Sequence, residues 1–178
     1  SMYFAEVRHT SAVMAWNQFK INNPGRFQNS EDFLVGARNV YQIVQTLLVE
    51  KPTHELRHLE GSFSKPAWSA MMEAAQQYTE LRSLYGDEAR IVFDEPPTAL
   101  LHAVAFPGDE RIIGQEGKAL EDGEVQDARI TAAVRFFADA HFAFNPRETS
   151  SKRDDTLYFE TAWEAENPVL DWKVVTVR

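Results

Sequence analysis

Hydrophobic residues in the first half of the chain recur at spacings of three and four, the pattern of amphipathic helices. This spacing predicts helices over residues 3–22, over residues 30–50 and from about residue 66 to residue 86. Prolines and glycines lie at the predicted ends, where they interrupt helices. We expect the apolar stripes to form the core, and the stripe of the first helix consists of Phe4, Val7, Ala12, Trp16 and Phe19.

The second half of the chain alternates between apolar and polar residues, the pattern of β-strands. The strongest signal is in residues 129–144, where apolar residues occupy the even positions. It predicts a long, half-exposed antiparallel strand, with a helix as the alternative because alanine is frequent. Other strands are predicted at residues 90–93, 99–106, 157–163 and 169–177, the last two as a hairpin.

Two polar segments of the second half predict loops. Residues 107–128 contain four glycines and many acidic residues, which indicates turns around a short strand near residues 111–113. Residues 145–155 are almost entirely polar. The order of elements therefore predicts an α+β fold, an N-terminal bundle of three main helices followed by a four- to six-stranded antiparallel sheet.

We expect residues 1–88 to form a helical region and residues 89–178 to form a β region packed on it, together one compact domain. The net charge of −9 lies mainly in residues 62–128, which hold 5 basic and 13 acidic residues. Because nucleic-acid binders need a basic face, we expect no nucleic-acid partner. The chain lacks a long apolar run and has no cysteine, so we expect a cytoplasmic protein that neither spans a membrane nor uses thiol chemistry.

The sharpest local motif is the string HELRH, which begins at His54 and matches the HExxH pattern of zinc hydrolases. On an α-helix, His54 and His58 would project from one face and could ligate one Zn²⁺. Glu55 could then act as general base on the metal-bound water. A third ligand would be Glu73 or Glu80 on the next helix. The alternative, which we favour, is a short surface helix with two exposed histidines and no metal.

A second pattern covers more of the chain. Arg8 and His9 precede Trp16 and Phe19 on the first predicted helix, and the second carries the string FLVGARNVYQIVQ from Phe33. These features, followed by a third helix that ends in Glu-Leu-Arg, resemble HEPN-type helical proteins, a group with many uncharacterised bacterial members. The resemblance spans residues 3–86. It implies a helical scaffold that commonly pairs with itself or lies beside a partner protein.

HEPN ribonucleases carry an Arg-x(4–6)-His motif, in which arginine stabilises phosphate charge and histidine acts as acid or base. The strings that begin at Arg82 and at Arg38 contain no histidine at the required spacing. Arg135 and His141 have the spacing, but they fall on the predicted long strand outside the resembling segment. The motif is therefore degenerate, and the resemblance implies a protein without ribonuclease activity.

We therefore predict a non-catalytic, cytoplasmic HEPN-like accessory or protein-interaction module without a cofactor, as a homodimer or beside a partner protein. The candidate binding residues are Arg8, His9, Arg38, Asn39 and Arg82. One alternative is a zinc-dependent hydrolase or peptidase with Glu55 as catalytic base and His54, His58 and Glu80 as ligands. The other is a small-ligand-binding α+β domain with an apolar pocket lined by Phe136, Phe142, Phe159 and Trp163.

Overall fold

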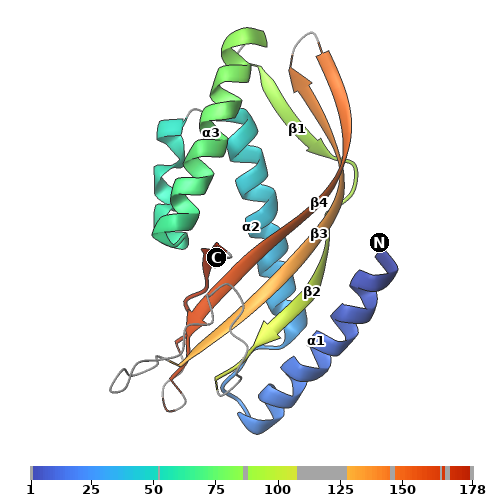
Figure 1. The fold of residues 1–178 in the computed structure, drawn as a ribbon, viewed down its shortest axis with the longest axis vertical. Coiled ribbons are helices and arrows are strands. Elements are labelled where there is room, and N and C mark those ends of the chain that lie inside the picture. The colour runs from blue at the N-terminus through green and yellow to red at the C-terminus, as the bar shows by residue number, and fades with distance from the viewer. Residues whose placement is uncertain are drawn as a thin grey trace. The chain divides into compact units, whose positions relative to one another are not determined.

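The computed structural model describes residues 2–51, 53–85, 88–107, 128–144, 147–164, 166 and 169–176. Within these ranges the helices precede the strands along the chain (Figure 1). The helices are α1 (Met2–Asn22), α2 (Ser30–Glu50), the 3₁₀-helix η1 (Thr53–Ser62) and α3 (Lys65–Tyr85). The three predicted main helices are thus confirmed. No helix in the described ranges is long and apolar enough to cross a lipid bilayer.

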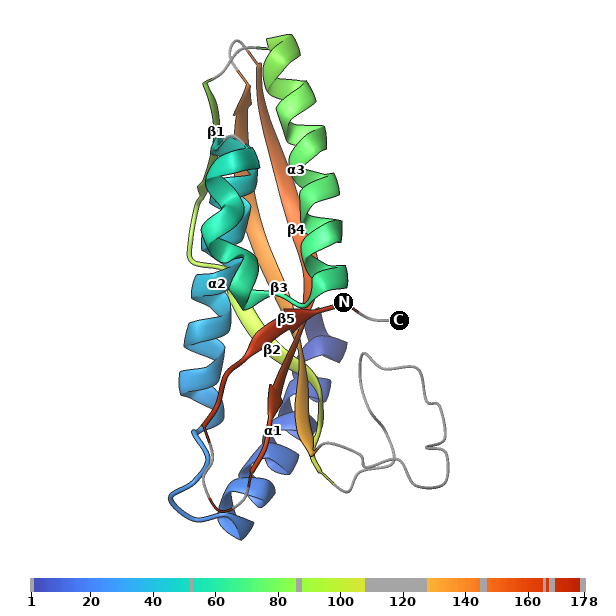
Figure 2. The same cartoon turned by 90° about the vertical axis from the view of Figure 1, so that its left-hand side faces the viewer.

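Within the described residues, the strands form one antiparallel sheet of five strands, which confirms the predicted α+β class. They are β1 (Ala89–Phe93), β2 (Thr98–Ala105), β3 (Arg129–Phe144), β4 (Arg147–Ala162) and β5 (Lys173–Val175). Their order is β1-β3-β4-β5, and β2 also pairs with β3. β5 pairs with β4 as the predicted hairpin partner, with Phe159 opposite Val174 (Figure 2).

Two sequence predictions concern the long strands, and one of them is wrong. β3 has the predicted bounds, so the alternative of a helix over residues 129–144 is excluded. The predicted loop at residues 145–155 is incorrect, because β4 begins at Arg147. This part of β4 consists entirely of polar residues, so no alternation of apolar and polar positions marks it in the sequence. The predicted short strand near residues 111–113 lies outside the described residues.

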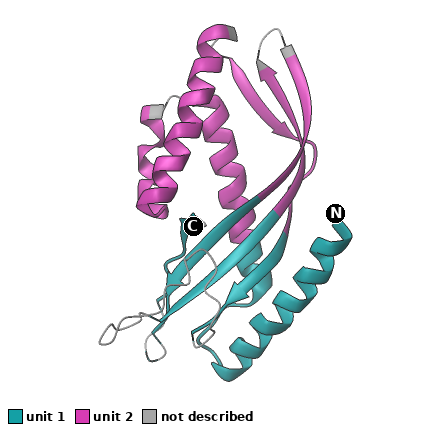
Figure 3. Cartoon of the chain, viewed as in Figure 1, with its two compact units in different colours: residues 1–34, 100–135, 156–178 teal, residues 35–99, 136–155 magenta. Residues whose placement is uncertain are grey.

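The chain divides into two compact units, each with helical and strand segments (Figure 3). Unit 1 comprises residues 1–34, 100–135 and 156–178, and unit 2 comprises residues 35–99 and 136–155. The sequence predicted a boundary between residues 88 and 89, with a helical region before it and a β region after it. The observed division differs, because α2, β3 and β4 each contribute to both units.

The core of unit 1 is aromatic. Trp16 is fully buried on α1, stacks on Phe27 at 4.6 Å between ring centroids, and packs on Phe33 at 5.0 Å. Its indole Nε1 donates to the backbone oxygen of Gln28 at 2.9 Å, which satisfies the buried polar group. The predicted role of Trp16 as a core residue is therefore confirmed.

The apolar stripe predicted for α1 is only partly correct. The buried face consists of Ala5, Ala12 and Trp16, whereas Phe4 and Val7 are exposed. Two of the three buried positions are alanines, which add little hydrophobicity to the pattern of the sequence. The large apolar side chains in the N-terminal half of α1 therefore lie away from the core.

Two clusters of buried residues, both within the described residues, form part of the core of unit 2. The first cluster joins α2 to the neighbouring elements η1 and α3. It contains Val44, Leu48, Leu56, Met71 and Ala75. The second joins the end of α2 to the sheet and contains Val49, Ala89, Ile91, Ala140 and Phe142. β1 is held in register there by antiparallel pairing with β3. The predicted stripes of the second and third helices thus supply core residues.

Candidate functional site

Arg82, one of the predicted binding residues, is a buried side chain with a structural role. Its Nη1 donates to the carbonyl oxygens of Leu48 and Val49, at 3.2 and 2.7 Å, and its Nη2 donates to that of Lys51 at 2.9 Å. These carbonyls lie at the C-terminal end of α2, where they lack intrahelical partners and where the helix dipole favours a cation. The guanidinium of Arg82 is thus occupied in capping α2.

Arg8 and His9 connect α1 to β2 within unit 1. Nε of Arg8 donates to the carbonyl oxygen of His102 at 3.3 Å, and the backbone N–H of Leu101 donates to Nδ1 of His9 at 3.0 Å. Burial lowers the pKa of His9, which favours the neutral imidazole that can accept this hydrogen bond. Both side chains therefore have a structural role, the connection of α1 to β2.

The remaining predicted binding residues, Arg38 and Asn39, lie on the part of α2 that belongs to unit 2. Arg38 is partly buried and Asn39 is exposed. Since Arg8 and His9 belong to unit 1, the five predicted residues are distributed over both units. They do not define one cluster within either unit.

The HELRH string lies in η1, and its geometry differs from that of a zinc-binding helix. A 3₁₀-helix has three residues per turn, so His54 and His58 are offset by about 120° around the axis. Both are exposed, and Nδ1 of His58 donates to the carbonyl oxygen of Glu55 at 2.8 Å. Leu56, in contrast, is fully buried and anchors η1 in the first core cluster of unit 2.

The described residues also place no third zinc ligand beside these two histidines. Glu80 is exposed on α3. In the part of the chain that the structure describes, no three His, Cys, Asp or Glu side chains are grouped so that they could hold a metal ion. The geometry therefore gives no support to the alternative of a zinc hydrolase.

The four aromatic residues predicted to line a ligand pocket belong to different units. Phe136 and Phe142 are buried in unit 2, where the ring of Phe136 stacks on that of Tyr41 at 4.4 Å. Phe159 and Trp163 are buried in unit 1, where Phe159 meets Phe33 edge to face at 5.7 Å. Each pair fills a core.

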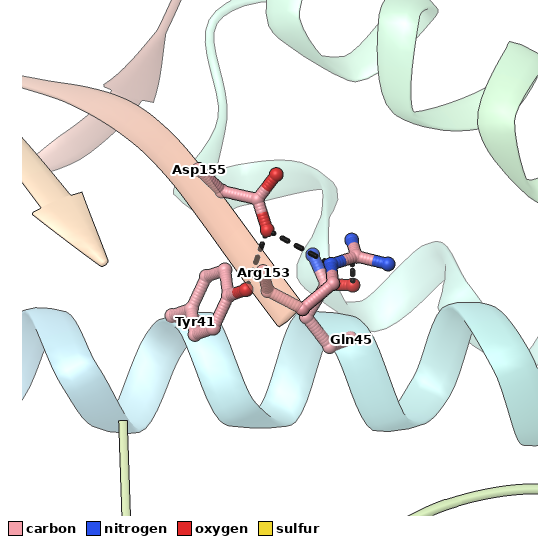
Figure 4. Close-up of polar contacts among 4 residues, drawn as sticks. All are labelled: Tyr41, Gln45, Arg153 and Asp155. Carbon is pink, nitrogen blue, oxygen red and sulfur yellow. Dashed lines mark hydrogen bonds and ion pairs between the residues drawn. The ribbon is translucent and has the colours of Figure 1, made fainter. Parts of the chain in front are cut away.

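A polar cluster between α2 and β4 in unit 2 was not predicted from the sequence (Figure 4). The hydroxyl of Tyr41 donates to Oδ2 of Asp155 at 2.5 Å. Arg153 donates from Nε to the same oxygen at 3.1 Å and from Nη2 to Oε1 of Gln45 at 3.0 Å. The one available signal was the i, i+4 spacing of Tyr41 and Gln45 on α2.

The chemistry of this cluster favours a structural role. Burial and the hydrogen bond to Asp155 raise the pKa of Tyr41 well above its usual value, so the phenol stays protonated as a donor. The guanidinium of Arg153 also lies over the ring of Phe142, 5.5 Å from its centroid. The cluster therefore connects α2 to β4.

A serine, a histidine and an aspartate form a hydrogen-bonded series on the sheet of unit 2. Oγ of Ser150 lies 2.8 Å from Nδ1 of His141, whose Nε2 lies 2.7 Å from Oδ1 of Asp94. Catalytic triads pair such a series with a buried aspartate and with backbone donors for an oxyanion. Here Asp94 and His141 are half exposed, and Ser150 lies within a paired strand. We interpret the series as a connection between β3, β4 and the residue that follows β1.

One side of α1 carries large apolar side chains that the fold leaves exposed. Tyr3, Val7, Met14 and Ile21, which we call the α1 outer face, are 69, 50, 68 and 70% exposed. At 3.6 residues per turn they fall within roughly 40° of one another, about opposite the buried Ala5, Ala12 and Trp16. Contiguous exposed apolar groups commonly mark interaction surfaces.

Comparison of the chain with known protein families and with curated proteins finds no match. The HEPN-like relationship therefore stays a prediction from the helix pattern of residues 3–86. Among the features described above, the α1 outer face is the one row of large, exposed apolar side chains, and it has no described structural role inside the fold. We take it as the candidate functional site.

Proposed function

We propose that this protein is a non-catalytic protein-interaction module, of the HEPN-like accessory kind, that acts in the cytoplasm. Its binding surface is the α1 outer face. The observation that supports this proposal is the row of four large apolar side chains along one side of α1, each at least half exposed. The charged and polar candidates of the sequence have structural contacts or no clustered geometry, so they support no catalytic alternative.

The energetics of the α1 outer face are adequate for binding. Removing a large apolar side chain from water contributes about 1.5–3 kcal/mol when the whole side chain is covered. The four residues are 50 to 70% exposed, so a partner that covers them gains several kcal/mol from the hydrophobic effect. A row along a straight helix is also the geometry by which amphipathic helices bind apolar grooves or other helices.

A site-specific photo-crosslinker tests this proposal. We would place a photoreactive amino acid at Met14, at the centre of the α1 outer face, and at Leu84 as a matched control. Leu84 is 75% exposed on α3 and is equally apolar. We expect a discrete crosslinked product at position 14 and none at position 84 when the protein is expressed and irradiated in cells. Equal or absent crosslinking at the two positions would overturn the proposal.

The non-catalytic part of the proposal has its own test. HEPN-type ribonuclease activity would depend on an arginine that reaches RNA, and Arg38 is a predicted binding residue that is partly exposed on α2. We expect the wild-type protein and the Arg38→Ala variant to leave a mixed-sequence fluorogenic RNA uncleaved. Cleavage by the wild type that is lost in Arg38→Ala would contradict a non-catalytic function.

A further inference from the structure

We infer that the partner of the α1 outer face is a second copy of the same chain, whose α1 lies antiparallel to the first. This inference rests on the proposed function and names its partner. It places a two-fold axis near the middle of α1, so that the same surface of each copy serves both sides of the contact.

The spacing of the exposed side chains favours a helix as the partner. Val7, Met14 and Ile21 are seven residues apart, and Tyr3 lies four residues before Val7. Thr10 and Asn17 complete an alternation of three and four. A seven-residue repeat keeps one seam in contact with a neighbouring helix over several turns, as in coiled coils. All six positions are exposed in the single chain.

Charges at the edge of this seam favour a second copy and fix its direction. Glu6 and Lys20 lie on the same edge, fourteen residues apart, so they occupy equivalent heptad positions near opposite ends of α1. In an antiparallel pair, Glu6 of each copy approaches Lys20 of the other. A parallel pair in register would instead place Glu6 level with Glu6 and Lys20 level with Lys20. Self-complementarity of this kind is expected of a two-fold interface.

The size and polarity of the seam predict a reversible dimer. From Tyr3 to Ile21 the seam is about 27 Å long, at 1.5 Å per residue. One helix pair of this length covers less than the roughly 1,600 Å² of a standard stable interface. Thr10 and Asn17 add polar positions, which lower the stability of helix pairs and favour one register. We therefore expect a dissociation constant in the micromolar range.

Analytical ultracentrifugation of the full chain over about 1–300 µM tests the inference. We expect the wild type and the control Leu84→Glu to shift from monomer to dimer with concentration, and Met14→Glu to remain monomeric. Glu6→Lys alone should weaken the dimer several-fold, as should Lys20→Glu alone, because each creates like-charge neighbours. The double variant Glu6→Lys/Lys20→Glu should recover most of the wild-type affinity. Circular dichroism verifies that each variant is folded.

The outcomes separate this inference from the function on which it rests. A wild type that is monomeric throughout, or a Met14→Glu dimer of undiminished affinity, would overturn self-pairing. Failure of the double charge variant to recover affinity would overturn the antiparallel arrangement. If the wild type is monomeric but the crosslinker at position 14 captures a different protein, self-pairing is wrong and the proposed function stands. If position 14 gives no product either, both are wrong.

Discussion

Arg82 on α3 donates a hydrogen bond of 2.7 Å to the carbonyl oxygen of Val49 near the end of α2. The same guanidinium reaches the carbonyls of Leu48 and Lys51, so one side chain satisfies several groups that a helix end leaves without partners. Arg82, which was predicted as a binding residue, thus supports the packing of α2 against α3.

Removal of this arginine should destabilise the fold. We expect Arg82→Ala to lower the free energy of unfolding by about 2–4 kcal/mol, because three carbonyls, those of Leu48 and Val49 in buried surroundings, lose charge-assisted hydrogen bonds. Urea denaturation followed by circular dichroism measures the change. Arg57→Ala, at an exposed position of η1, is the control and should stay within about 0.5 kcal/mol of the wild type. A loss of similar size in both variants would contradict the capping role.

The hydrogen bond between Tyr41 and Asp155 should make stability depend on alkaline pH. The pKa of Tyr41 is raised in the folded state, so its contribution is fully present below about pH 10, the unfolded value, and is lost as pH rises above it. Tyr41→Phe should be about 1 kcal/mol less stable at neutral pH and should lose less stability between about pH 9 and 11. Denaturation curves at each pH give both quantities. Parallel pH profiles for the two proteins would contradict this expectation.

His9 should produce the opposite dependence, on the acid side. Its pKa is lowered in the folded state, so its contribution is present above about 6.5, the unfolded value, and is lost as pH falls through this range. His9→Gln keeps an acceptor for the N–H of Leu101 but cannot titrate. We expect a smaller loss of unfolding free energy between about pH 7 and 5 in His9→Gln than in the wild type. His54→Gln, at an exposed site, should follow the wild type.

The histidines of the HELRH string should not retain zinc. They are offset around a 3₁₀-helix, and no third ligand joins them among the described residues. Elemental mass spectrometry on protein purified without a nickel column or chelator should find the same low zinc content in the wild type and in His58→Ala. About one zinc per chain in the wild type, absent from the variant, would contradict this expectation and revive the hydrolase alternative.

Much of the fold could be predicted from local patterns. Helix boundaries followed from proline and glycine, and the even-numbered apolar residues of β3 gave its bounds. The first part of β4 could not be predicted, because its side chains are mostly exposed and its strand conformation comes from pairing with β3. Because residues 147–155 are all polar, their sequence carries no alternation of apolar and polar positions from which a strand could be predicted.

The candidate site was harder to predict than the fold. α1 carries apolar residues on two opposite sides. From the sequence, the large residues Phe4 and Val7 are expected in the core, but Ala5 and Ala12 are buried instead. Only the tertiary structure distinguishes the two sides. Arg82 was likewise found by its position in a family pattern, yet its capping role depends on carbonyls more than thirty residues away. Local sequence does not encode such contacts.

The most direct test of the α1 outer face as an interaction surface compares the yield of photo-crosslinked product at Met14 with that at Leu84 in living cells. Both side chains are apolar and more than two-thirds exposed. A difference in crosslinking yield between them therefore reports a bound partner and not non-specific hydrophobic adsorption. We predict a discrete product at position 14, several-fold more abundant than any at position 84. Equal yields, or no product at either position, would contradict the proposed function.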